Sequence, residues 1–352
     1  MAGHDLVVVG ASAGGVEALA ELVRGLSRNL PAAVCVVLHL PADSTSLLPQ
    51  ILSRAGALPA IHARDGELLR HGHVFVAPPD SHLVVEPGRL RLLAGPRENG
   101  HRPSIDVLFR TAAQAYGPRV VGVILSGTLD DGTAGLLAIK RRGGLAVVQQ
   151  PADARYPGMP QSALEHVVVD EVLPVRDIPA ALSRLAREPA PGEAAAPSAA
   201  LQEEIRAAEV DLERLNRDAY PGAPSVYTCP ECSGSLWELR DGELLRYRCR
   251  VGHAFTAESL LASQAGSVEA ALWAALRALE EKASLASRMA EQATARGYQL
   301  TAVRFAEQEA DARQRAAVIR RALLVDAESL PGPATVETLI TEAAEAEGGA
   351  PD

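Results

Sequence analysis

The feature that most constrains this chain is an alternation, from residue 5 to about residue 187, of short apolar runs with amphipathic stretches. The apolar runs, such as Leu6–Val9 and Val34–Leu38, are rich in valine and show no polar alternation. Strands that are apolar on both sides are typical of a parallel sheet covered by helices on both faces. We therefore predict a doubly wound α/β fold with a mostly parallel sheet.

Helix and strand signals follow one another in the order that such a fold requires. Strands are expected at residues 6–10, 34–38, 73–77, 119–125 and 145–149, and helices at residues 15–23, 46–53, 104–116 and 133–141. Two further apolar runs, at residues 83–85 and 90–93, flank Pro87-Gly88, which predicts a β-hairpin.

The second half of the chain has a different composition. Residues 188–200 are rich in proline and alanine, which predicts a linker after a first domain at residues 1–187. Beyond the linker we expect a helix at 201–220, a cysteine-rich module at 221–260, a helical hairpin at 261–326 that turns at Gly297, and a flexible acidic tail at 327–352. One face of the first helix in this hairpin is lined by Leu272, Leu276, Leu279, Ala283 and Ala286.

The formal charge of −10 limits the partners of the protein. Nucleic-acid phosphates are bound by clustered Lys and Arg, so we expect no nucleic-acid role. The N-terminus, Met1–Asp5, has no basic region, and the apolar run after it is too short for a signal sequence or a membrane span. We expect a cytoplasmic protein without membrane insertion.

Ser12 lies in a glycine-rich loop, Gly10–Gly15, between the first predicted strand and the first predicted helix. In open α/β sheets, ligands bind at this end of the strands. Small neighbours leave the hydroxyl approachable, and N–H groups at the helix start can stabilise an oxyanion. Two other interpretations stay open. One is a dinucleotide-binding turn, although the loop lacks the central glycine of G-x-G-x-x-G, and the other is a plain connection.

His39 and Asp131 are the candidate partners of Ser12, because each follows a predicted strand at the same edge of the sheet. Taken singly, a histidine in this place is usually structural, and an aspartate is usually a helix N-cap. Three such residues at three strand ends favour a nucleophile, a base and an orienting carboxylate. Asp130 remains the alternative carboxylate. The chain order Ser, His, Asp differs from the order found in α/β-hydrolases.

These residues suit the hydrolysis of a carboxyl ester. His39 would take the Ser12 proton as the ester carbonyl is attacked and return it to the leaving alkoxide. Asp131 would orient the imidazole and stabilise its charged form. This chemistry requires no cofactor. The oxyanion would be held by backbone N–H groups of Ala13, Thr128 and Leu129.

Five sequence blocks occur in order over about half of the chain: Val9–Gly15, Leu38–Pro41, His101–Asp106, Val123–Gly127 with Asp131-Gly132, and Pro157–Pro160. At these blocks the chain resembles the catalytic domain of the chemotaxis protein-glutamate methylesterases, the CheB type, over about residues 5–185. The resemblance implies a doubly wound α/β fold with Ser12 as nucleophile, His39 as base and Asp131 as third member. It further implies removal of methyl esters from glutamates on the cytoplasmic helices of chemoreceptors, and deamidation of certain receptor glutamines.

The chain departs from the family pattern at three positions near the expected oxyanion site. Ala13 stands where the family typically has threonine, Thr128 where methionine is common, and Leu129 where glycine is usual. The resemblance also implies a change in regulation. With Ser12 so close to the N-terminus, we expect no N-terminal phosphoryl-receiver domain, and hence either constitutive activity or control by the C-terminal half.

Three of the four cysteines form a cluster with a histidine in the pattern C-x2-C…C-x3-H. Four such ligands suit a tetrahedral structural zinc of the zinc-ribbon type, which predicts a metal that stabilises the module without reacting. A redox pair is the less favoured alternative, because no thioredoxin-like βαβ unit adjoins the pair. The fourth cysteine, Cys35, is expected to be a buried small hydrophobe. The ligands are Cys229, Cys232, Cys249 and His253.

The C-terminal helices are expected to pack on each other, and they offer a docking surface for a sensory or methyltransferase partner. Two other functions remain open at this point. One is a non-catalytic, zinc-stabilised interaction protein that keeps an esterase fold. The other is an esterase or amidase for another small substrate.

Overall fold

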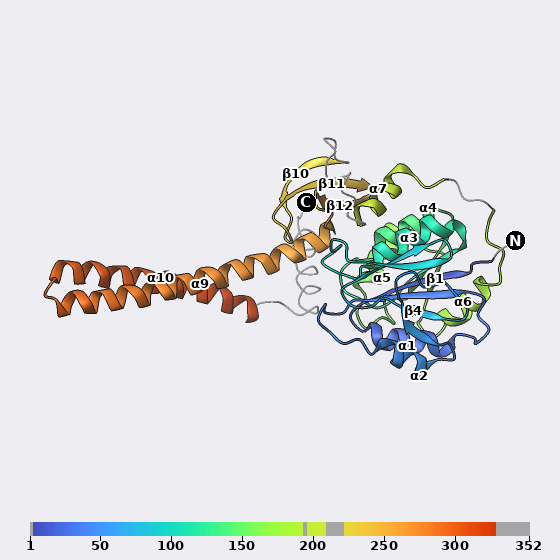
Figure 1. Ribbon diagram of the computed structural model, residues 1–352, viewed down its shortest axis with the longest axis horizontal. Coiled ribbons are helices and arrows are strands. Elements are labelled where there is room, and N and C mark those ends of the chain that lie inside the picture. Colours follow the sequence, from blue (N-terminus) through green and yellow to red (C-terminus); the bar gives the residue numbers. More distant parts are fainter. Residues whose placement is uncertain (1–2, 193–195, 209–221, 329–352) are drawn as a thin grey trace, which may run out of the picture. The chain divides into compact units, whose positions relative to one another are not determined.

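Seven parallel strands form the central sheet of the computed structural model, which describes residues 3–192, 196–208 and 222–328 (Figure 1). The chain divides into two compact units, Met1–Ser263 and Gln264–Asp352, and the sheet belongs to the first. Its strand order is β3-β4-β2-β1-β7-β8-β9. The bounds are β1 Leu6–Ala11, β2 Ala33–Leu38, β3 Ala60–His62, β4 Val74–Val76, β7 Val120–Ile124, β8 Leu145–Gln149 and β9 Glu171–Leu173.

Helices cover both faces of this sheet and enclose two separate cores (Figure 1). Val7 and Val9 of β1 point into one core, whereas Leu6 and Val8 point into the other, and all four are fully buried. The first core is covered by α1 (Gly15–Gly25), α2 (Leu48–Ala55) and α6 (Ile178–Leu185), and the second by α3 (Ile105–Tyr116), α4 (Thr133–Arg141) and α5 (Gly158–His166). The predicted doubly wound α/β fold is confirmed.

The strand order reverses at β1, which lies between β2 and β7. The helix that follows β1 covers one face, and the helix that follows β7 covers the other. In open α/β sheets the crevice at such a switch point is the usual place for a ligand. The fold therefore marks the carboxyl ends of β2, β1 and β7 as the functional edge.

The predicted hairpin and a second small sheet complete the described part of the first unit. The hairpin is β5 (His82–Glu86) with β6 (Arg89–Leu93), as the Pro87-Gly88 turn indicated. The cysteine-rich module is a four-stranded antiparallel sheet of β10 (Ala223–Thr228), β11 (Ser235–Asp241), β12 (Leu244–Cys249) and β13 (Ala254–Thr256). Its small core, which includes Leu236, Tyr247 and Phe255, is distinct from the two cores of the large sheet.

Some boundaries differ from the sequence expectation, and some segments lie outside the described residues. We did not predict the short strands β3 and β9 or the helices α5 and α6. Edge strands of three residues, such as β3 and β9, leave almost no periodic signal in the sequence. The helix expected at 201–220 is observed as α7 (Ala199–Ala208), and the rest of that segment is not described. Most of the tail expected at 327–352 is likewise outside the described residues.

In the second unit, α9 (Ala257–Ala295) turns into α10 (Gln299–Glu328) at Gly297, as predicted. Gly297 has φ 78°, a left-handed conformation that favours glycine, and Tyr298 N–H donates to the Ala293 carbonyl in a Schellman turn. In the stripe predicted on the first helix, Leu276, Ala283 and Ala286 are buried. Among the helices of the described residues, none is long and apolar enough to cross a membrane.

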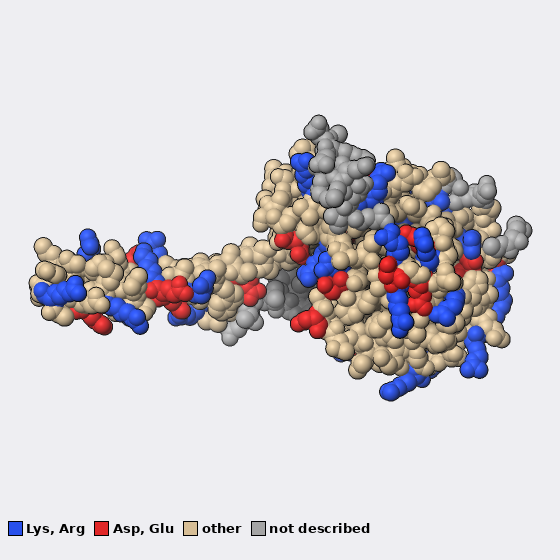
Figure 2. Space-filling view, in the orientation of Figure 1, with Lys and Arg blue, Asp and Glu red and all other residues tan. Residues whose placement is uncertain are grey.

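Basic and acidic side chains lie interspersed on the face of the first unit that Figure 2 shows. Ion pairs join several of the surface charges, for example Lys140 with Asp170 at 2.7 Å, and Arg119 with Asp5. Such exposed pairs contribute only ~0–1 kcal/mol each to stability. The net negative charge is therefore partly compensated locally, and recognition of an acidic partner would rest on local contacts.

We predict that Phe75→Ala lowers the free energy of unfolding by about 3–5 kcal/mol, because it removes a large side chain from a packed core. Phe75 lies on β4 and is fully buried. The exposed Leu68, with 67 % exposure, is the control, and Leu68→Ala should change stability by less than about 0.5 kcal/mol. Urea unfolding measures both. A Phe75→Ala loss no larger than the control would contradict the assigned core.

Candidate active site

The structure brings Ser12, His39 and Asp131 together at the functional edge. Ser12 follows β1, His39 follows β2, and Asp131 lies in the loop between β7 and α4. Hydrogen bonds extend the sheet ladder past the strand ends, since Ser12 N–H donates to the Ser126 carbonyl and His39 N–H to the Ala11 carbonyl. Ser12 and His39 are thus positioned by the sheet itself, and Asp131 by the loop that follows β7.

The imidazole of His39 links the other two side chains. Its Nδ1 is 3.1 Å from Ser12 Oγ, and its Nε2 is 2.7 Å from Asp131 Oδ2. With the proton on Nε2 donated to the carboxylate, Nδ1 is free to accept the Ser12 hydroxyl proton. This is the arrangement that a serine nucleophile needs, with Nδ1 rather than Nε2 as the basic atom.

The carboxylate of Asp131 is buried and surrounded by donors at the start of α3. Its Oδ2 accepts the Ile105 N–H at 2.8 Å, and its Oδ1 accepts the Ser104 hydroxyl at 3.0 Å and the Asn99 amide at 2.9 Å. Burial alone would raise the pKa of Asp131, but the hydrogen bond and charge of His39 and the Ile105 N–H hold that pKa well below its usual range. Asp131 is therefore ionised at neutral pH.

Asp130, the alternative carboxylate, points elsewhere. It is 4 % exposed and contacts Thr256 of the cysteine-rich module, whereas the contact with His39 is made by Asp131. Burial raises the pKa of Asp130 to about 7, and the contact with Thr256 offsets this only in part. The geometry thus separates two adjacent aspartates that their position after the strand alone could not, and it favours the one that the family resemblance implies.

Of the three residues predicted to bind the oxyanion, Ala13 directly follows Ser12, and Thr128 and Leu129 directly follow Gly127, which lies close to Ser12. In the hydrogen bonds of the described residues, the N–H groups of Ala13, Thr128 and Leu129 donate to no protein acceptor, so they are available to a ligand. Leu129 has φ 58°, a left-handed conformation that costs a non-glycine residue about 1 kcal/mol. At this position the family usually has glycine, which adopts such a φ without that cost.

Gly127 allows the loop after β7 to approach Ser12. A Cβ on Gly127 would lie 2.0 Å from the Met159 sulfur and 2.9 Å from Ser12 Cβ, so no larger residue fits. The loop is fixed on its other side, since Gly127 N–H donates to the Tyr156 carbonyl and Met159 N–H to the Gly127 carbonyl, both at 2.9 Å. The Pro157–Pro160 block thus supports the loop next to the nucleophile.

Two residues of the site were not identified from the sequence. The ring of His101 stacks on His39 with centroids 3.6 Å apart, and burial together with the nearby His39 lowers the pKa of His101 to about 4. Asn99 donates to Asp131 from the preceding turn. The dipeptide Asn99-Gly100, a strong signal for a tight turn, was the available clue. A cavity of about 340 Å³ opens beside His39, lined also by Arg97 and Arg102.

The four predicted metal ligands also come together, in the cysteine-rich module. Their ligand atoms lie within 4.8 Å of one another. Cys232 Sγ and Cys249 Sγ are 3.7 Å apart, and Cys249 Sγ is 3.5 Å from His253 Nδ1. A tetrahedral zinc, with bonds of ~2.3 Å to sulfur and ~2.0 Å to nitrogen, spaces its ligand atoms about 3.5–3.8 Å apart. The donor set therefore fits such an ion.

Comparison with known proteins agrees with this site. Residues 7–182 match the protein family described as CheB methylesterase. The chain belongs to this family. The crystal structure of the Thermotoga maritima CheB methylesterase catalytic domain resembles it with a TM-score of 0.50 and 34 % sequence identity, over 53 % of this chain and 100 % of that one.

Two relatives named as protein-glutamate methylesterases are each matched over about half of their length. It is 43 % identical to protein-glutamate methylesterase/protein-glutamine glutaminase 2 of Anaeromyxobacter dehalogenans, over 52 % of this chain and 54 % of the relative. It is 41 % identical to protein-glutamate methylesterase FrzG of Myxococcus xanthus, over 51 % and 54 %. The chain thus spans about half the length of these relatives, and the cysteine cluster lies beyond the matched residues.

We predict that Asp130→Asn stabilises the protein at pH 8 relative to wild type and has little effect at pH 4. The pKa of Asp130 is about 7 in the folded state and near 3.8 when unfolded, so the folded state holds the proton more tightly. The free energy of unfolding of the wild type therefore falls as pH rises from about 4 through 7. Asparagine does not ionise, so the variant lacks this fall. Thermal unfolding of both proteins between pH 4 and 8 measures the effect. Parallel curves would refute it.

Proposed function

We propose that this protein is a protein-glutamate methylesterase in which Ser12 is the nucleophile, His39 the general base and Asp131 the orienting carboxylate. The observation that carries the proposal is the continuous hydrogen-bonded chain from Ser12 Oγ through His39 to the buried Asp131 carboxylate. Membership of the CheB methylesterase family supports the same reaction. The substrate is a methyl-esterified glutamate on the cytoplasmic helices of a chemoreceptor, which places the protein in the cytoplasm.

The reaction proceeds in two acyl-transfer steps. Ser12 Oγ attacks the ester carbonyl while its proton moves to His39 Nδ1, and the charged imidazole is stabilised by Asp131. Collapse of the tetrahedral intermediate breaks the bond to the methoxy oxygen, which takes the proton from His39 and leaves as methanol. A water molecule then attacks the acyl-serine, again with His39 as base, and releases the glutamate carboxylate and free Ser12.

The oxyanion of each tetrahedral intermediate would be held by the backbone N–H groups of Ala13, Thr128 and Leu129. Loss of one oxyanion donor typically costs about 10²–10³-fold in kcat, so these groups are as important as the triad. Because they are main-chain groups, the replacement of the family's threonine by Ala13 and methionine by Thr128 leaves them in place. A glutamine side chain presents the same carbonyl, so deamidation with release of ammonia would follow the same steps.

The cysteine-rich module is proposed to hold one structural zinc ion through Cys229, Cys232, Cys249 and His253. The ligand-atom spacing supports this, as do the tight turns at the cluster, in which Cys229 N–H donates to the Gly234 carbonyl and Cys249 N–H to the His253 carbonyl. With four protein ligands, the ion would stabilise the module's fold and take no part in ester hydrolysis. A sensory or methyltransferase partner for the C-terminal helices stays a prediction.

We predict that Ser12→Ala and Asp131→Asn each lower kcat for methanol release from methylated receptor membranes by at least about 10³-fold, as expected for members of a catalytic triad. Asp130→Asn, a matched change one residue away, should keep activity within about threefold, because Asp130 does not contact His39. Retained methanol release by Ser12→Ala would overturn the proposal. Equal losses in the two aspartate variants would overturn the choice of Asp131.

We predict one zinc per chain in elemental analysis of the purified protein. Cys249→Ser should abolish zinc binding and lower the melting temperature of the module, since binding free energy is part of its folding free energy. Cys35→Ala is the control, because Cys35 is buried in β2, away from the cluster, and its loss should leave zinc content unchanged. Zinc-free wild-type protein with unaltered unfolding would contradict the assignment.

A further inference from the structure

A four-residue turn, Glu98–His101, joins the active site to the cysteine-rich module; we call it the 98–101 turn. Asn99 and Gly100 both have positive φ, 52° and 77°, and the two ends exchange hydrogen bonds, Glu98 N–H to the His101 carbonyl and the reverse. This is the geometry of a tight hairpin turn, which Asn-Gly favours. Such a turn is stiff, so a displacement of the residues on one side of it also displaces the residues on the other side.

On its inner side the turn contacts the proposed catalytic residues. Asn99 Nδ2 donates to Asp131 Oδ1 at 2.9 Å and to Asp106 Oδ2 at 3.1 Å. His101 stacks on His39. The turn therefore contacts both the base and the carboxylate that orients it.

On its outer side the same asparagine is held by the module. Asn99 Oδ1 accepts the Thr256 N–H and the Ser259 hydroxyl, each at 3.0 Å, and Asn99 N–H donates to the Ala254 carbonyl at 2.7 Å. Asn99 is 6 % exposed, so water cannot readily replace these partners. The donors that fix the amide oxygen thus come from β13 and from the start of α9.

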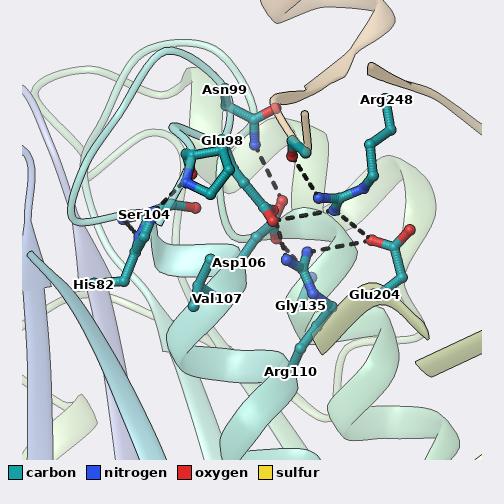
Figure 3. Close-up of polar contacts among 12 residues, drawn as sticks. His82, Glu98, Asn99, Ser104, Asp106, Val107, Arg110, Gly135, Glu204 and Arg248 are labelled. Atoms are coloured by element: carbon teal, nitrogen blue, oxygen red, sulfur yellow. Dashed lines mark hydrogen bonds and ion pairs between the residues drawn. The ribbon is translucent and has the colours of Figure 1, made fainter. Parts of the chain in front are cut away.

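A buried ion network fixes the neighbouring residue. Glu98 is 1 % exposed and pairs with Arg110 of α3 and with Arg248 of β12, while Glu204 of α7 bonds Arg248 at 2.8 Å (Figure 3). Burial would raise the pKa of Glu98, but the two guanidinium groups hold that pKa below its usual value. Breaking such a buried pair leaves an uncompensated charge, so the ordered module holds the turn firmly in place.

The residues that grip the turn adjoin the metal cluster in sequence. Ala254 directly follows His253, Arg248 directly precedes Cys249, and Arg248 also donates to the Gly252 carbonyl at 2.8 Å. Ordering of these two ligands therefore orders the contacts to Asn99 and Glu98. The separate core of the module means that the large sheet does not depend on this ordering.

We propose that Asn99 is a positioning residue for Asp131 and that the metal-loaded cysteine-rich module acts as a clamp on the 98–101 turn, so that metal occupancy sets the rate of ester hydrolysis. This rests on the proposed esterase function. Small displacements of an orienting group can cost up to about 10²-fold in rate, so release of the clamp is sufficient to regulate the enzyme. The matched family residues end at 182, so the module lies outside the part of the chain that the family description covers.

The test is a cycle of four measurements on the full chain, with wild type and Asn99→Ala, each zinc-loaded and after removal of the metal by a chelator. In wild type, metal removal should lower kcat for methanol release from methylated receptor membranes about tenfold or more, with KM changed less than about threefold. Asn99→Ala should lose a similar factor when loaded. Removing its metal should then have no further effect, because the amide link from the turn to Asp131 is already cut. If the losses from Asn99→Ala and from metal removal multiply, or if metal-free wild type keeps full activity, the clamp proposal is wrong.

A second readout reports the nucleophile directly and needs no receptor. The rate of Ser12 labelling by a fluorophosphonate should fall on metal removal in wild type and stay constant in Asn99→Ala. Ser259→Ala, which removes one hydrogen bond to Asn99, should slow labelling of the loaded protein about threefold to tenfold. Ser225→Ala is the matched control, because it removes a module hydrogen bond to the Leu236 carbonyl with no contact to the turn. Equal labelling rates for these two serine variants would also overturn the clamp.

The two proposals fail in different ways. If loaded wild type releases no methanol while Ser12 labelling still depends on the metal, the proposed substrate is wrong and the clamp stands. If methanol is released equally with and without metal, and equally by Asn99→Ala, the esterase stands and the clamp is wrong. Far-UV circular dichroism of each metal-free protein must show that the large sheet is intact. If metal-free wild type is unfolded throughout, the clamp proposal is wrong, because loss of the whole fold would then explain the lower activity.

Discussion

Burying the negative charge of Asp131 costs several kcal/mol unless specific partners offset the loss of water, and the active site is arranged around those partners. The N-terminus of α3 supplies the Ile105 and Asp106 N–H groups, the preceding loop supplies the Ser104 hydroxyl and the Asn99 amide, and His39 supplies its Nε2. Because a helix N-terminus also favours negative charge, the carboxylate stays ionised and fixed. The orientation of His39, and through it the reactivity of Ser12, follows from this one group. The first role of the side chains around Asp131 is thus to stabilise its buried negative charge.

The fold and the meeting of the three candidate site residues could be predicted because their signals are local. Valine-rich runs such as Val34–Leu38 reveal buried parallel strands without any knowledge of tertiary contacts, and Ser12, His39 and Asp131 each follow such a run. Parallel strands share one carboxyl edge, so three residues far apart in sequence could be assigned to one place. The choice between Asp130 and Asp131 was beyond this reasoning, since a loop of unknown conformation decides which of two neighbours faces the imidazole.

The contacts of Asn99 could not be predicted, and the reason is physical. Its partners lie in four segments, including Asp131 and Ser259, and nothing in the spacing of these residues indicates that they meet. The same is true of Glu98 and Arg248, a buried pair separated by 150 positions. In sequence both look like ordinary surface charges, because burial of a charge depends on which module packs against it. Sequence periodicity reports how an element packs on its own sheet, but it says little about how two modules meet.

His39 presents Nδ1, and not the outer nitrogen, to the Ser12 hydroxyl. Nδ1 is bonded to the ring carbon that carries Cβ, so it lies closer to the main chain than Nε2 does, and rotation of the ring is restrained by the hydrogen bond between Nε2 and Asp131. The main chain at residue 39 is itself tied to the first strand through the Ala11 carbonyl. In the proposed reaction, the Ser12-to-His39 distance for proton transfer is therefore set largely by backbone pairing between two central strands, whereas the orientation of the ring is set by Asp131.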